Sequence, residues 1–182
     1  MTPLKTSSLA LAGFAVLALV VVQFAPWATH TEKQGGGQFA GFTFPATTST
    51  IQADTWRMDV QVNDNSDETS WYDSDFDDTD GIGLLRTAIP MFLVGMVVVL
   101  AGGLINGLRP MPLGSILCLA GGVVLLTGLI LFCIGTTQVY DEFSTDPTWH
   151  VSFYFGIAAV AAAFGAGVTG LLNGRDVGYM TA

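Results

Sequence analysis

The acidic run over residues 63–81 holds the side chains of this sequence that are best suited to binding a ligand. Calcium-binding loops place carboxylates at alternating positions, and the stretch Asp73-Ser74-Asp75-Phe76-Asp77 begins in this way. It departs from such a loop because Asp78 stands where the sharp-turn glycine belongs and no glutamate closes the loop. A solvated acidic surface is the simpler interpretation. The alternative is a weak cation site, whose ligands would be Asp73, Asp75, Asp77, Asp78 and Asp80.

The other reactive side chains are scattered along the sequence. A hydrolase needs a nucleophile beside a base, or a metal triad, whereas His30 and His150 lie far apart. Ser115 and Cys118 fall inside an apolar stretch that offers no ionisable partner, and no Cys-x-x-Cys pattern is present. We therefore predict that the protein is not an enzyme and needs no metal or cofactor. A zinc site made of the two histidines and an acid is the alternative.

The composition indicates that an integral membrane protein carries these residues. Of 182 residues, 51% are hydrophobic and 12% are charged, whereas soluble domains average about a quarter charged residues. The net charge of −9 excludes a nucleic-acid-binding protein that depends on clustered lysine and arginine. The apolar content excludes a disordered acidic chain. The lipid bilayer is therefore the first partner that the sequence predicts.

Four apolar stretches are each about as long as the roughly 20 residues that a helix needs to cross a bilayer. Backbone hydrogen bonds in lipid must be made within the segment, so we interpret all four as helices. The first apolar stretch, which follows Lys5, could be a signal peptide. It is long for a signal peptide, however, and cleavage after Ala28 would leave Pro26 where a small residue is expected. We expect it to be retained. The predicted segments are a tail and first helix at 1–27, an outer segment at 28–83, a second helix at 84–108, an inner turn at 109–112, a third helix at 113–138, an outer loop at 139–150, a fourth helix at 151–173 and an inner tail at 174–182.

The connections between these helices differ sharply in charge. The N-terminus, the inner turn and the C-terminal tail together carry three basic residues and one acid. The outer segment, the start of the second helix and the outer loop carry three basic residues and fourteen acids. Basic connections stay in the cytoplasm. We therefore predict a multi-pass protein of the plasma (cytoplasmic) membrane with both termini cytoplasmic.

The outer segment shows the period-two pattern of β-strands. Residues 38–44 alternate, with Phe42 and Phe44 on one face, after a flexible glycine stretch at 35–37. Residues 55–62 alternate more cleanly, and one face holds Trp56, Met58, Val60 and Val62. Residues 45–50 are interpreted as the connection between these strands. We expect a small antiparallel sheet over the outer ends of the helices.

The order of these features resembles the claudin family and its four-span relatives, the peripheral myelin protein and epithelial membrane protein group. The first span ends in Pro26-Trp27, Trp56 stands near the place of the family's signature tryptophan, and Arg86 opens the second span in the stretch Leu84-Leu85-Arg86-Thr87-Ala88. Residues 120–129 and 154–159 are similar to the third span and to the start of the fourth. The family's paired outer cysteines are absent from 28–83. The resemblance implies a distant, prokaryotic member: a membrane all-α four-helix bundle with a small extracellular antiparallel β-sheet.

Arg86 is the one charge within an apolar stretch, about one turn inside its outer end. An arginine at this depth must reach water or a partner. We predict a structural lock, in which Arg86 contacts the ring of Trp27 or Trp56, or an outer acid, and so holds the sheet on the helices. A simple interfacial anchor is the alternative.

Small residues recur at a spacing of four along two spans. Such faces let helices approach closely. Packing within the chain is the expected use, and lateral self-association into a homo-oligomer is the alternative. The residues of this kind are Gly103 and Gly107 in the second span and Ala158, Ala162, Ala166, Gly170 and Gly174 in or just after the fourth.

The function that these features favour is non-enzymatic. We expect a structural, adhesion or complex-accessory role, with a membrane-protein partner or a second copy bound through the outer sheet and the lateral helix faces. Two alternatives remain. The acidic outer face could attract cations to a permeability or channel-type element, or it could serve a cation-dependent surface sensor.

Overall fold

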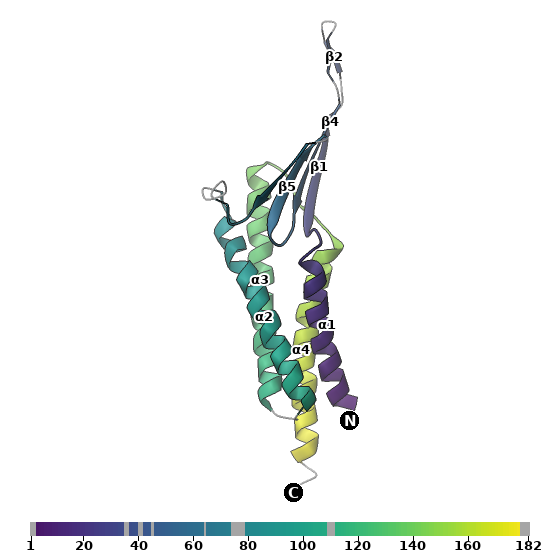
Figure 1. Ribbon diagram of the computed structural model, residues 1–182, viewed down its shortest axis with the longest axis vertical. Coiled ribbons are helices and arrows are strands. Elements are labelled where there is room, and N and C mark those ends of the chain that lie inside the picture. Colours follow the sequence, from purple (N-terminus) through teal and green to yellow (C-terminus); the bar gives the residue numbers. More distant parts are fainter. Residues whose placement is uncertain are drawn as a thin grey trace.

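The computed structural model describes the backbone of residues 3–34, 37–39, 42–44, 46–63, 65–73, 79–108 and 112–178, and the side chains of these residues outside 3–5, 34–45 and 174–178. Within it, four helices form from the four apolar stretches (Figure 1). Their bounds are α1 Pro3–Val22, α2 Ile82–Leu108, α3 Pro112–Glu142 and α4 Val151–Gly178.

The four helices lie side by side (Figure 1). Helix α1 packs against α2 and α4, and α3 packs against the same two helices. Three segments are long and apolar enough to cross a membrane: α2, α3 and the 151–173 part of α4. The apolar part of α1 that carries described side chains, Thr6–Val22, is shorter. These helices suit a lipid environment, because apolar residues cover the outward faces as well as the core.

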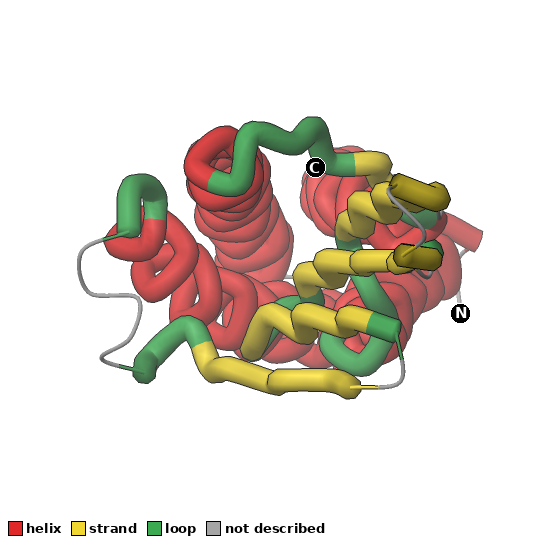
Figure 2. Tube along the Cα trace, turned by 90° about the horizontal axis from the view of Figure 1, so that it is seen from above, coloured by secondary structure: helices red, strands yellow, loops and turns green. Residues whose placement is uncertain are grey.

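An antiparallel sheet of five strands stands at one end of the helices (Figure 1). Seen from above, its strands lie side by side over the helix ends (Figure 2). The strand order is β6-β5-β4-β1-β7. A separate two-stranded ribbon, β2 with β3, projects beyond the sheet (Figure 1). The bounds are β1 Ala28–Gln34, β2 Gly37–Phe39, β3 Phe42–Phe44, β4 Thr47–Ala53, β5 Arg57–Val62, β6 Asn65–Ser70 and β7 Thr148–Trp149.

The sheet differs from the predicted one in its strands. Residues 37–39 and 42–44 form the two paired strands of the ribbon, in which Phe39 pairs with Phe42, and not one strand. The predicted connection at 45–50 is wrong, because Thr47 begins the central strand β4, which pairs with β1 and β5. Strands β1, β6 and β7 were not predicted. Their polar residues show no apolar alternation, and backbone pairing with neighbours holds them in place.

One face of the sheet packs on the helices only near its base. Ala53 and Met58 are buried there, and Val60 is half-buried against the core. The predicted buried face of residues 55–62 is wrong at both ends, since Trp56 is 38% exposed and Val62 is 43% exposed. The strands rise away from the helices (Figure 1), so the apolar face runs beyond the surface that could cover it.

Candidate functional site: the junction between the sheet and the helices

Trp27 is the centre of the junction between the sheet and the helices. The first helix ends at Val22 and not at Trp27 as predicted; Pro26, which has no backbone N–H to continue a helix, follows shortly after. The Trp27 side chain is fully buried. Its ring stacks on Phe92 of α2 with a centroid distance of 5.6 Å and lies 4.8 Å from the ring of Phe132 of α3. One tryptophan between α1 and β1 therefore contacts two other helices.

Every polar group of Trp27 has a partner. Its indole Nε1 donates to Thr55 Oγ1 at 2.8 Å, and that buried hydroxyl donates to Val22 O at 3.3 Å. The backbone N–H of Trp27 donates to Ala53 O, and its carbonyl accepts from the N–H of His150. A buried indole N–H without a partner would be costly. These bonds instead fasten the end of α1 to β4 and to the start of α4.

Tyr140, near the end of α3, fastens the sheet from beneath. Its side chain is fully buried. The hydroxyl lies 3.1 Å from Ala28 O and 3.2 Å from Ile51 O, which belong to the neighbouring strands β1 and β4. Its single proton is shared between the two carbonyls. Helix α3 continues beside the sheet (Figure 1), and this extension brings the hydroxyl into reach of both strands.

Arg86 joins α2 to the segment that follows β6. Its Nε donates to Trp71 O at 2.7 Å and its Nη2 donates to Asp73 O at 2.8 Å. The hydroxyl of Tyr72 donates to Arg86 O at 3.1 Å in return. Trp71 is fully buried and its indole donates to Asp54 O. The guanidinium thus binds backbone carbonyls of the outer segment.

The hydrogen bonds of Arg86 given above reach the carbonyls of Trp71 and Asp73, and the predicted contact with the ring of Trp27 or Trp56, or with an outer acid, stays a prediction. Trp27 lies in the aromatic core, and Trp56 precedes β5 with its ring partly exposed. Trp71, one of the aromatic residues that the sequence places among the acids and that could dock this segment on the sheet, occupies the buried position beside Arg86.

Helix α4 and the loop before it complete the junction. Ser152 Oγ donates to Pro26 O at 2.6 Å, and His150 Nε2 lies 2.6 Å from Thr29 Oγ1. His30 Nδ1 lies 3.1 Å from Asp146 O. The two histidines thus bind different partners. Among the residues described, no group of three His, Cys, Asp or Glu side chains is arranged to hold a metal ion.

The proposed weak cation site cannot be placed in this junction. Asp75, Asp77 and Asp78 lie outside the described residues. Asp73 uses its carbonyl to accept from Arg86, and the backbone N–H of Asp80 donates to Glu142 Oε1. The cation site therefore stays a prediction from the sequence.

A second polar cluster lies at the far end of the helices and joins all four of them. Asn106 Nδ2 donates to Ser8 Oγ at 3.1 Å, and Ser115 Oγ donates to Asn106 Oδ1 at 3.3 Å. Ser8 Oγ donates to Ala166 O at 2.8 Å. The side chains of all three polar residues are buried. A Cβ on Gly170 would collide with the Asn106 and Ser115 side chains, so the amide occupies a slot that glycine leaves open.

The predicted small residues have mixed placements. Gly103 lies against Ala12 of α1, Gly107 lies against Leu9, and Gly170 lines the Asn106 slot. Ala162 and Ala166 are buried, whereas Ala158 is half-buried. The side chain position of Gly174 lies outside the described part. A Cβ would collide with the facing helix at four further glycines of α2 and α3, which were not predicted: Gly95, Gly102, Gly114 and Gly121.

No family model and no curated protein matches this chain. The geometry of the junction offers hydrogen bonds, stacked rings and buried apolar surface. Its arrangement can fix the sheet at a defined position on the helices.

Proposed function

We propose that this chain is a claudin-like membrane protein with four spanning helices, which holds a small outer sheet rigidly above the bilayer for a structural, adhesion or complex-accessory role. The observation that carries the proposal is the junction, in which every helix contacts or bonds the sheet or its flanking segments. Trp27 follows α1, Arg86 belongs to α2, Tyr140 to α3 and Ser152 to α4. A sheet held at four points keeps its exposed surface in a fixed orientation.

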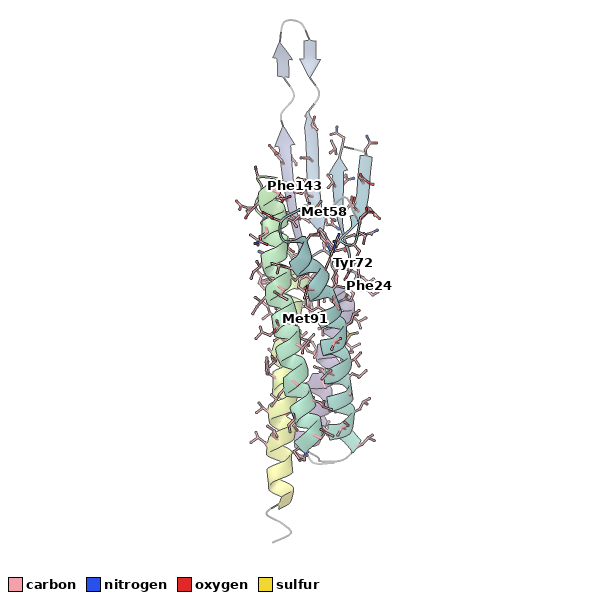
Figure 3. All side chains as sticks on the ribbon, turned by 90° about the vertical axis from the view of Figure 1, so that its left-hand side faces the viewer. Phe24, Met58, Tyr72, Met91 and Phe143 are labelled. Atoms are coloured by element: carbon pink, nitrogen blue, oxygen red, sulfur yellow. The ribbon has the colours of Figure 1, made fainter. Side chains whose placement is uncertain are left out.

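Exposed aromatic side chains support a membrane boundary at the level of the junction. Phe24 is 85% exposed and Tyr72 is 54% exposed, and Figure 3 places them at a similar height along the molecule. Tyr72 also bonds the backbone of Arg86. Aromatic and arginine side chains are enriched where a membrane meets water. The sheet would then stand outside and the helices within the bilayer.

The proposed orientation puts both termini in the cytoplasm and retains α1. Packing of α1 between α2 and α4, with Ser8 in the four-helix polar cluster, supports retention. A cysteine at Ser66 in β6 should react with an impermeant reagent on intact cells, whereas a cysteine at Gly178 should react only after permeabilisation. The reverse pattern would contradict the orientation, and labelling of neither position before permeabilisation would contradict an outer sheet.

The role itself is tested by purification of the full chain in mild detergent, followed by reconstitution into liposomes. A stable partner or a defined homo-oligomer, without cation flux, is the expected result. Cation flux that falls when the acids of the outer segment are neutralised would instead support a permeability element. If the purified chain binds no partner, forms no oligomer and passes no cations, both proposed roles are contradicted.

A further inference from the structure

The ribbon of β2 and β3 continues the hairpin that β1 and β4 begin in the sheet. Gln34 pairs with Thr47 at the end of the sheet. Three residues further along each strand, Gly37 pairs with Phe44 in the ribbon. The ribbon stands beyond the sheet on the side away from the helices, and no other helix or strand that the structure describes lies beside it (Figures 1 and 3).

The pairing register places the aromatic residues of the ribbon on one face. Residues directly opposite each other in an antiparallel pair share a face, and so do residues two apart in one strand. Phe39 pairs with Phe42, and Phe44 lies two residues after Phe42. Gln38 pairs with Thr43 on the opposite face. The ribbon is therefore amphipathic, and we call the face with the three phenylalanines the aromatic face of the ribbon.

The position of the ribbon leaves its aromatic face to be covered from outside the described chain. A two-stranded ribbon by itself is marginally stable in water. Removal of an apolar face from water is favourable. A surface that covers the aromatic face would therefore stabilise both the ribbon and the contact.

The size of the aromatic face argues against a folded protein as its partner. The strands of the ribbon have three residues each, so the ribbon measures about 10 Å along its strands and about 10 Å across them. A specific protein interface buries roughly 800 Å² on each partner, which is several times the area of such a face. A lipid bilayer needs no matching shape, because amphipathic elements lie at its surface with their apolar face buried.

Charge and position indicate which bilayer the ribbon meets. Residues 34–53 contain no charged residue, although the outer segment as a whole is strongly acidic. The seven residues of β1 span about 23 Å, so the ribbon lies roughly 20 Å further from the helix ends than the junction does. This separation exceeds the Debye length of about 8 Å at physiological salt, so the acids near the junction are screened at the ribbon. The ribbon points away from the bilayer that the helices would cross.

We propose that the aromatic face of the ribbon docks on an opposing lipid bilayer, with the sheet as the spacer between the two membranes. The paired strands satisfy each other's backbone groups, as an apolar environment requires. Phenylalanine supplies the buried apolar area, and the polar face with Gln38 and Thr43 stays toward water. This inference rests on the proposed outer position of the sheet, and it gives the adhesion role a lipid surface as its partner.

The test is flotation of the full chain, held in a lipid nanodisc, with phosphatidylcholine vesicles. The nanodisc covers the helices, so the vesicles serve as the opposing bilayer. The natural protein should float with the vesicles, and the fraction bound should persist in 0.5 M NaCl, about where surface charges are largely screened. Each of Phe39→Ser, Phe42→Ser and Phe44→Ser should weaken docking on the order of tenfold, and the triple variant should not float.

A matched control changes the opposite face of the same ribbon, by Gln38→Ser and Thr43→Ser, and should leave docking unchanged. Leucine at all three phenylalanine positions should retain docking, because it keeps the apolar area. Equal Tm values for the natural protein and the serine variants would show that the fold is retained.

Absence of flotation of the natural protein, or equal loss in the control variant, would overturn the proposal. Association of the nanodiscs with each other in place of vesicle binding, if the serine substitutions abolish it, would also overturn it and identify a second copy as the partner. Failure of the proposed orientation would appear separately in the cysteine labelling at Ser66 and Gly178, which does not depend on vesicle binding.

Discussion

Replacement of Tyr140 by phenylalanine should weaken the attachment of the sheet to the helices while it leaves packing almost unchanged. The variant removes one hydroxyl from a fully buried ring, and this hydroxyl lies 3.1 Å from Ala28 O and 3.2 Å from Ile51 O. Loss of a buried hydrogen bond that leaves an acceptor without a partner costs about 1–3 kcal/mol. Both carbonyls belong to strands paired with each other, so we place Tyr140→Phe at the lower end, about 1–2 kcal/mol.

For a chain of this size the loss corresponds to a decrease in Tm of roughly 2–8 °C. Thermal unfolding in detergent measures the decrease, and amide hydrogen exchange should show faster exchange in β1 and β4 than in the helices. Tyr154→Phe is the control, because Tyr154 is 60% exposed on α4. Equal Tm values for the two variants, or faster exchange spread evenly over the chain, would refute a fastening role for Tyr140.

Three further substitutions test other parts of the structure. Arg86→Leu should loosen the outer segment and speed protease cleavage there while the helices stay intact, whereas Arg57→Leu, which removes two exposed ion pairs, should change cleavage little. Asn106→Leu should cost about 0.6–1.7 kcal/mol for each hydrogen bond lost between the helices, measured by detergent unfolding; an unchanged midpoint would contradict a stabilising role of the polar cluster. Val60→Asp should lower Tm by placing a charge in a half-buried position, and Gln61→Asp should not; equal shifts would contradict the assigned strand face.

The sequence allowed prediction of the helices but not of their exact ends. Continuous apolar stretches mark the parts of the chain suited to lipid, and α2, α3 and α4 follow them closely. Trp27 was placed at the end of a helix because it ends an apolar stretch. Its buried position depends on Phe92 and Phe132, residues from distant parts of the sequence.

The outer sheet could be predicted only where side chains alternate. Residues 57–62 alternate between apolar and polar side chains and form β5. The threonine-rich β4 shows no such alternation, so part of it was predicted to be a connection although it is the central strand. The lock was predicted between Arg86 and Trp27, Trp56 or an outer acid, whereas the hydrogen bonds seen at Arg86 reach the backbone of Trp71 and Asp73. Backbone carbonyls accept from Arg86, and a sequence carries no pattern for which carbonyl a turn will present.

The polar cluster was missed for a related reason. Asn106, Ser8 and Ser115 come from three helices that are apolar on all sides, so no periodic pattern tells which faces meet. Glycines are so frequent in this chain that no single glycine indicates where a side chain from another helix will fit. Only the packed structure shows that Gly170 leaves the space in which the amide sits.

The bond between Ser8 and Ala166 joins residues that are 158 positions apart. During synthesis α1 emerges first and α4 emerges last, so the Ser8 hydroxyl has no Ala166 carbonyl to bond until nearly the whole chain has been made. β1 likewise depends on β7 for one edge. The first and last elements close the molecule together, and a chain that stops before α4 would leave α1 without its main neighbour. The bundle therefore cannot close around α1 before α4 has been made, and contacts between residues this far apart in sequence are expected to slow folding.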